Sequence, residues 1–320
     1  MFFQSNSIKH PNQPSTHKKQ VRGDLLTGKK LLRCAVYTLL SAAFFTLPPQ
    51  AGKAAVKTCS NQLSAGIPER ISDAPSGTSV MQALRNVSGQ RRDDAVTEQV
   101  LSGNVPEFLR QLAPVEIPGV LATGERVLVT ICVTPEYLAV GNDDDFVRVP
   151  MGLAAAAMVA TELGFFLPTP KMVDEIYKRA QIRLTPRPMK PTAQMVSTDY
   201  LMRHSLMLDK QRNSEKPSPT ALTAGQKKDI VITNRLRSKP GRVAIYGWHR
   251  PNGRPIQPLS TVHGAEYADY SHGVRLVSQT AFVNGRPMDL SDLMAHQELA
   301  GVVSAEGPII DVRSLMASKF

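Results

Sequence analysis

Three of the seven histidines of this chain, His249, His263 and His272, fall within 24 residues. Histidine is the side chain whose ordinary pKa lies nearest to neutral pH, so it suits both proton transfer and metal ligation. Around the three histidines lie further side chains that can bind a substrate or assist acid–base chemistry: Tyr246, Trp248 (the only tryptophan), Tyr267, Asp269, Tyr270, Ser271 and Arg275. We therefore expect the functional site between residues 246 and 275.

General acid–base hydrolysis is the first interpretation of this segment. His263 and His272 would transfer protons, and Asp269 would orient an imidazole and favour its charged form. Ser271 is a candidate nucleophile, but it directly precedes His272, and neighbouring side chains on a strand point to opposite faces. A Ser271–His272 dyad is therefore disfavoured, while Ser271 with His263 across strands stays open. The expected substrate-binding residues are Tyr246, Trp248, His249, Tyr267, Tyr270 and Arg275, the last of them for an anionic group.

A metal site is the second interpretation. His249, His263 and His272, or two of them with Asp269, could hold zinc with an open position for water. The segment 263–269 resembles the His/Asp signature of zinc peptidases that cleave peptidoglycan cross-links, but it is one residue short and lacks their later His-x-His. Zinc is therefore a candidate cofactor that the spacing alone does not assign.

The segment 271–276 resembles the Ser-His-Gly-Cys-Val/Ile-Arg segment of L,D-transpeptidases, and His263-Gly264 resembles their upstream His-Gly. The two segments lie within a stretch of 14 residues, 263–276. Val274 directly follows the glycine, where that family has its nucleophilic cysteine. Because thioester chemistry needs that thiolate, the resemblance does not assign the family.

An export signal is expected at the N-terminus. Lys29, Lys30 and Arg33 precede an apolar run at 34–47, and a Pro-Pro pair and small residues follow. This order is typical of a secretory signal peptide, and 14 apolar residues are fewer than the roughly 20 that a membrane-spanning helix needs. We expect a leader and signal peptide at 1–54, no transmembrane span after cleavage, and a periplasmic or secreted protein.

The positive charge is concentrated in that leader. Residues 1–54 hold eight Lys/Arg and one Asp, which gives +7 of the net charge of +11. The remaining 30 basic and 26 acidic residues leave only +4, so nucleic acid is not an expected partner. A local excess remains at 227–254, where eight Lys/Arg face a single acidic residue. The expected partner is an extracellular or envelope polymer or peptide.

Two cysteines, Cys59 and Cys132, remain after the signal peptide. In an exported protein such a pair permits one disulfide. Two free thiols fit the sequence nearly as well, because the pair has no diagnostic spacing. Neither cysteine lies near the histidines, so thiol catalysis is not expected.

The order of predicted elements indicates an α+β fold, in one large domain or two closely packed lobes. After a flexible tether at 55–79, residues 80–209 read as short helices, a central antiparallel meander at 126–149 and a helix pair at 153–180. An exposed loop is expected at 210–226. A strand-rich part at 227–320 carries the histidines, with strands at 229–233, 242–246 and 273–283 and a turn at Asn284-Gly285.

Several function classes lack their motifs. The chain has no Gly-rich phosphate loop before a helix, no HExxH and no GxSxG elbow. The leading hypothesis is an exported hydrolase that acts on an envelope or extracellular polymer through a histidine-centred site. The alternative is a non-catalytic glycan- or peptide-binding envelope protein, with a purely structural envelope protein as the third.

Overall fold

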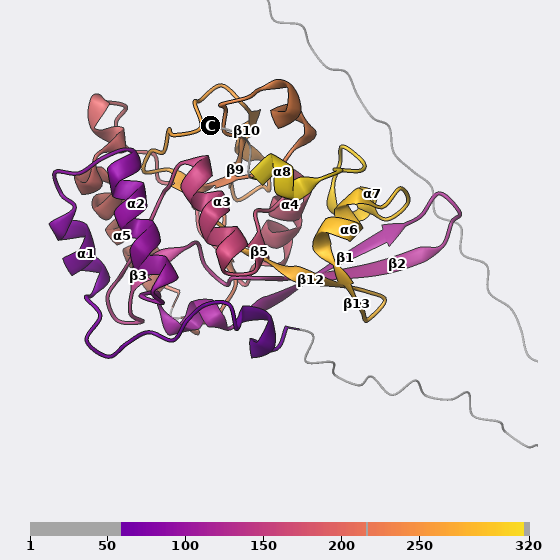
Figure 1. Ribbon diagram of the computed structural model, residues 1–320, viewed down its shortest axis with the longest axis horizontal. Coiled ribbons are helices and arrows are strands. Elements are labelled where there is room, and N and C mark those ends of the chain that lie inside the picture. The colour runs from indigo at the N-terminus through magenta and orange to yellow at the C-terminus, as the bar shows by residue number, and fades with distance from the viewer. Residues whose placement is uncertain (1–58, 216, 317–320) are drawn as a thin grey trace, which may run out of the picture. The chain divides into compact units, whose positions relative to one another are not determined.

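The computed structural model describes residues 59–215 and 217–316 (Figure 1). The leader and signal peptide expected at 1–54 lie outside the described residues. The described part combines helices with sheets that are mostly antiparallel, which confirms the α+β fold class. Among the described helices, none has the length and apolar character needed to cross a membrane.

The helices of the described part are α1 (Gly77–Ala83), α2 (Gln90–Leu101), α3 (Leu153–Glu162), α4 (Pro170–Arg179), α5 (Thr198–Asn213), α6 (Leu290–Ala295), α7 (Ala300–Val303) and α8 (Val312–Met316), with 3₁₀ turns η1 (Asn61–Ser64), η2 (Glu107–Arg110), η3 (Ala193–Val196) and η4 (Asn234–Ser238). The strands are β1 (Ala113–Val120), β2 (Arg126–Val133), β3 (Ala139–Gly141), β4 (Phe146–Arg148), β5 (Phe165–Phe166), β6 (Ile182–Arg183), β7 (Thr223–Ala224), β8 (Lys228–Ile230), β9 (Ile245–His249), β10 (Pro255–Ser260), β11 (His272–Gly273), β12 (Val277–Val283) and β13 (Arg286–Asp289).

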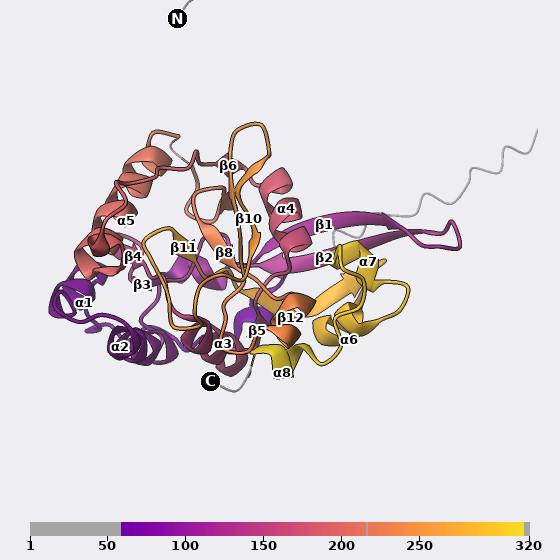
Figure 2. The ribbon, with the colours of Figure 1, turned by 90° about the horizontal axis from the view of Figure 1, so that it is seen from above.

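The larger sheet places β2 between β1 and β12, with β13 and β5 also paired to β12. β2 spans the residues expected from its β-branched and apolar composition, which suits a buried strand. β1 escapes the sequence pattern because it contains Pro114 and Pro118, which a strand tolerates at the edge of a sheet. Figures 1 and 2 show β1 and β2 as a long hairpin that extends away from α1, α2 and α5.

The meander expected at 126–149 is present only in its second half. β3 and β4 pair antiparallel around the acidic turn, as expected. β2 pairs instead with β1 and β12. After β2 the backbone amides of Thr134 and Leu138 donate to the carbonyls of Leu276 and Val274, so the chain turns away before it reaches β3.

The smaller sheet has the order β10-β9-β8-β11 and carries four of the predicted site residues: Tyr246, Trp248, His249 and His272. β8 pairs antiparallel with β9 and parallel with β11, which sets Lys228 opposite His272. The strands expected at 229–233, 242–246 and 273–283 thus correspond to β8, β9, β11 and β12 with shifted ends. β10 was not expected, because Pro255 and Pro258 weaken its strand signal; it too lies at an edge.

Helix ends follow their local signals. α3 ends before Gly164, whose φ of 79° is the left-handed conformation that favours glycine after a helix. α4 begins at Pro170, and the hydroxyl of Thr169 accepts a hydrogen bond from the amide of Met172 at 3.2 Å. The exposed loop expected at 210–226 is shorter than expected, because α5 continues to residue 213 and residues 222–226 are buried beside β6.

Cys59 and Cys132 form a disulfide, so of the two alternatives for this pair the structure has the bridge. Cys132 is buried near the end of strand β2. The segment expected as a tether is therefore joined to the core at its first described residue, and Ile67 packs into the same core.

Candidate functional site

The structure divides the predicted site residues into two groups. His263, Tyr267, Asp269, Ser271 and His272 lie together and are called the histidine cluster below. Tyr246 and His249 instead meet Asp174 of α4, and this second place is called the Asp174 pocket.

Asp269 organises the turn that precedes β11. Its Oδ1 accepts hydrogen bonds from the backbone amide of Ser271 at 2.7 Å and from the Ser271 hydroxyl at 2.5 Å. Its Oδ2 accepts one from the Tyr267 hydroxyl at 3.2 Å. The Ser271 hydroxyl therefore points to the carboxylate, with no hydrogen bond to either histidine of the cluster. This geometry gives Ser271 a positioning role through Asp269.

Three aromatic rings of the histidine cluster, His263, Tyr267 and His272, lie in contact with one another. His263 and Tyr267 stack with ring centroids 4.2 Å apart, and both side chains are partly exposed. His272 lies 6.2 Å from His263 and 5.7 Å from Tyr267, centroid to centroid, and is fully buried. The stacked pair is thus the outer layer of the cluster and His272 the inner layer.

Neither ring nitrogen of the buried His272 has a hydrogen-bond partner among the described residues, as is also the case for the buried His204. Burial lowers the pKa of His272 to about 4, although Asp269 opposes the shift. The imidazole is therefore neutral at pH 7. Burial alone would raise the pKa of Asp269, but His272 and the hydrogen bonds from Ser271 lower it overall, so the carboxylate stays charged.

Two lysines and Trp248 surround this cluster on the side of β8 and β9. Lys228 is the β-sheet neighbour of His272, and its ammonium lies 5.2 Å from the centroid of the Trp248 ring. Lys227 is buried, donates to the carbonyl of Tyr270 at 2.6 Å, and has its pKa lowered by burial to about 7. The sequence showed these lysines only as part of a basic stretch, because the pairing of β8 with β11 is a long-range contact.

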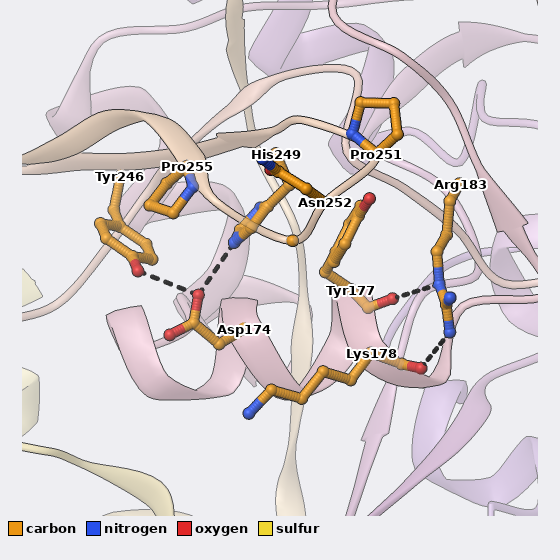
Figure 3. A pocket seen from close by; sticks show the side chains of 10 residues that line it. Asp174, Tyr177, Lys178, Arg183, Tyr246, His249, Pro251, Asn252 and Pro255 are labelled. Carbon is orange, nitrogen blue, oxygen red and sulfur yellow. Dashed lines mark hydrogen bonds and ion pairs between the residues drawn. The ribbon is translucent and has the colours of Figure 1, made fainter. Parts of the chain in front are cut away.

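The Asp174 pocket opens between α4 and the β9–β10 turn (Figure 3). It has a volume of about 380 Å³. Asp174 Oδ1 accepts hydrogen bonds from the Tyr246 hydroxyl and from His249 Nε2, both at 2.9 Å. The His249 ring stacks on Tyr177 with centroids 4.5 Å apart. Burial, and then the neighbouring Asp174 carboxylate, raises the pKa of Tyr246.

Two expected substrate-binding residues are committed to the protein interior. Arg275 is fully buried, and its guanidinium donates to the carbonyls of Thr134 and Thr223. Tyr270 is also buried, with its hydroxyl hydrogen-bonded to the backbone of Met189. Both side chains hold neighbouring segments together, and neither has the exposure that contact with a surface ligand needs.

The three histidines considered as zinc ligands do not converge, because His249 belongs to the Asp174 pocket. Within residues 59–215 and 217–316, no group of three or more His, Cys, Asp or Glu side chains is arranged to hold a metal ion. Asp269 instead accepts hydrogen bonds from Tyr267 and Ser271.

Comparison of the chain with protein-family models, with curated proteins and with solved structures found no match.

Proposed function

We propose that this protein is a hydrolase of ester or amide bonds in an extracellular or envelope polymer, with the histidine cluster as its active site. The observation that carries the proposal is the fully buried, neutral His272 with two ring nitrogens that no described residue satisfies. Leaving a polar group buried without a partner destabilises a protein by about 1–3 kcal/mol, so its presence beside Asp269, His263 and Lys228 favours a functional role.

The outer imidazole, His263, is the general base. It takes a proton from a water molecule whose oxygen forms a bond to the carbonyl carbon of the substrate. The carbonyl–oxygen or carbonyl–nitrogen bond then breaks, and the His263 imidazolium gives its proton to the leaving alcohol or amine. Because His263 is partly exposed, it is the member of the cluster that a polymer can approach.

The inner imidazole, His272, is fully buried next to the stacked His263–Tyr267 pair, so it is a positioning residue that acts on the reaction through His263. Because burial lowers its pKa to about 4, His272 stays neutral at pH 7 and does not repel the His263 imidazolium that forms during turnover. The Lys228 ammonium, on the neighbouring strand, adds positive charge on the same side. Asp269 fixes the turn through Ser271 and balances that charge.

Amide or ester hydrolysis is favoured over glycoside hydrolysis by the number of carboxylates. Glycosidases ordinarily use a pair of carboxyl groups that flank the scissile bond. Among the described residues that form the histidine cluster, Asp269 is the single carboxylate, and it accepts hydrogen bonds from two hydroxyls.

The Cys59–Cys132 disulfide supports the proposal that the protein acts outside the cytoplasm. Disulfides form and persist in oxidising compartments such as the periplasm and the extracellular space. The expected signal peptide points the same way, although it lies outside the described residues.

The test is a pH-stat assay of acid release from acylated envelope polysaccharides, together with an assay of newly formed amino groups on peptidoglycan and cross-linked peptides. We expect turnover by the wild type and a loss of about 10²–10⁴-fold in His263→Ala, the contribution typical of a general base. His296→Ala is the control, because His296 is exposed and lies on a different part of the chain. Saturable polymer binding without any turnover would replace this proposal with a binding module.

A further inference from the structure

The Asp174 pocket has features of a ligand-binding site and is separate from the histidine cluster (Figure 3). One carboxylate oxygen, Oδ1, accepts both hydrogen bonds that the described residues make to Asp174, from Tyr246 and His249. The other oxygen, Oδ2, has no partner among the described residues, and the Asp174 side chain is 35% exposed. His249 beneath it is 2% exposed and held by Tyr177. A fixed carboxylate therefore presents a free acceptor to the pocket.

An irregular backbone in β9 builds this arrangement. Residues three apart on a regular strand point to opposite faces, yet Tyr246 and His249 both reach Asp174. Between them Gly247 and Trp248 both have positive φ, 107° and 57°. A bulky residue in the left-handed region is a genuine outlier, and such outliers concentrate at functional sites. The irregular backbone at Gly247-Trp248 brings the side chains of Tyr246 and His249 to the same side of β9.

Close packing around Gly247 and Trp248 holds this irregular backbone in place. A Cβ on Gly247 would lie 3.2 Å from Val173 Cγ1 and 3.4 Å from Asp229 Oδ2, so the glycine allows β9 to approach α4. Trp248 packs under the Lys228 ammonium. The pocket is therefore held by β9, whose neighbour β8 pairs in turn with β11 of the histidine cluster, while Tyr246 and His249 face Asp174 of α4.

The charges around the pocket indicate a ligand without net charge. Lys178 and Arg183 line the pocket and are opposite in sign to Asp174. Lys178 is also paired with Glu175 at 2.7 Å, and the Arg183 guanidinium also donates to the carbonyls of Tyr177 and Lys178. An amine would meet the two cations, and a carboxylate or phosphate would meet Asp174. A hydroxyl group avoids both problems, because it donates to the free Oδ2 and accepts from one of the two cations.

The walls complete the description of that ligand. Flat or ring-shaped side chains line the pocket: Tyr177, Tyr246, His249, Pro251 and Pro255. Its volume of about 380 Å³ lies within the range of about 300–1,000 Å³ common for small-molecule sites. We propose that the Asp174 pocket binds an uncharged sugar unit of a glycan, with sugar hydroxyls on Asp174 and the apolar face of the ring against the aromatic wall.

The proposal is tested by calorimetric titration of the full chain at pH 7 with four tetrasaccharides. Cellotetraose and tetra-N-acetylchitotetraose are the uncharged probes, and the chitosan tetramer and tetragalacturonate are the cationic and anionic ones. The variants are Asp174→Asn and the nearly isosteric Tyr246→Phe. Asp144→Asn, at an exposed carboxylate in the β3–β4 turn, is the matched control.

We expect saturable binding of at least one uncharged probe, about 10–100-fold weaker in Asp174→Asn, as for loss of hydrogen bonds to a charged group. Tyr246→Phe should weaken it severalfold, and Asp144→Asn should not change it. Absence of binding by both uncharged probes up to about 10 mM, tighter binding of a charged probe, or full affinity in Asp174→Asn would each overturn the proposal. Binding should persist in His263→Ala, so failure of the hydrolase proposal and failure of this one are separable.

Discussion

Replacement of His272 by leucine should stabilise the protein and lower its activity. Leucine has a similar volume and no polar atoms, so His272→Leu removes two buried ring nitrogens that have no partner among the described residues. The expected gain in the free energy of unfolding at pH 7.5 is about 1–3 kcal/mol. The rate of hydrolysis should fall by up to about 10²-fold, as for misplacement of the general base His263 by about 1 Å.

The gain in stability should grow in acid. In the unfolded chain a histidine takes a proton as pH falls through 6.5, whereas folded His272 takes one only near pH 4. The neutral, buried form therefore contributes stability above pH 6.5 that is lost between pH 6.5 and pH 4. The wild type should lose about 2 kcal/mol by pH 5 and about 3 kcal/mol by pH 4, in addition to changes shared with the variant.

Urea unfolding of wild type and variant at pH 7.5, 6 and 5, followed by circular dichroism, measures this difference directly. The matched control is His204→Leu, because His204 is equally buried, packs 4.9 Å from the Tyr270 ring, and has its pKa lowered by burial. His204→Leu should also gain stability in acid but keep the wild-type rate. A His272→Leu variant that is less stable than wild type at every pH, or equally active, would refute the reasoning.

Three further predictions concern the scaffold. Reduction of the disulfide should lower the free energy of unfolding by about 4 kcal/mol, which is the loop-entropy value for cysteines 73 residues apart. Urea unfolding with and without dithiothreitol measures this change, and an unchanged midpoint would contradict the prediction. Glu136→Gln leaves the buried Arg148 without one of its two carboxylates and should destabilise by about 3 kcal/mol, whereas a thermal scan that matches wild type would argue against a structural ion pair. Gly247→Ala should destabilise by about 1–3 kcal/mol in the same scans, and by more than Gly285→Ala, because both glycines have positive φ but only Gly247 is closely packed.

Much of the fold could be predicted because its signals are local. The β-branched run of β2, the Thr169-Pro170 start of α4 and the Asn284-Gly285 turn each depend on a few neighbouring residues. β1 and β10 escaped prediction because their prolines are acceptable only at a sheet edge, and edge position is a property of the whole sheet.

In the candidate site, too, the residues close in sequence could be predicted and those brought together by long-range contacts could not. His263, Asp269 and His272 lie close in the sequence, and the structure brings them together. Lys228 joins them only through the parallel pairing of β8 with β11. Asp174 could not be predicted as a site residue, because the apolar pattern of its helix, α4, indicates only a helix that packs on the core. Its contact with His249 joins residues 75 positions apart in the sequence. No local sequence pattern predicts such a contact.

The central claim, hydrolysis at the histidine cluster, is tested most directly by isotope incorporation. A polymer that the protein binds would be incubated with wild type in H₂¹⁸O, and the released carboxylic acid analysed by mass spectrometry. The account predicts one ¹⁸O atom in the new carboxyl group, formed by wild type and by His204→Leu but not by His263→Ala. Absence of ¹⁸O from the product of the wild type, or undiminished incorporation by His263→Ala, would contradict it.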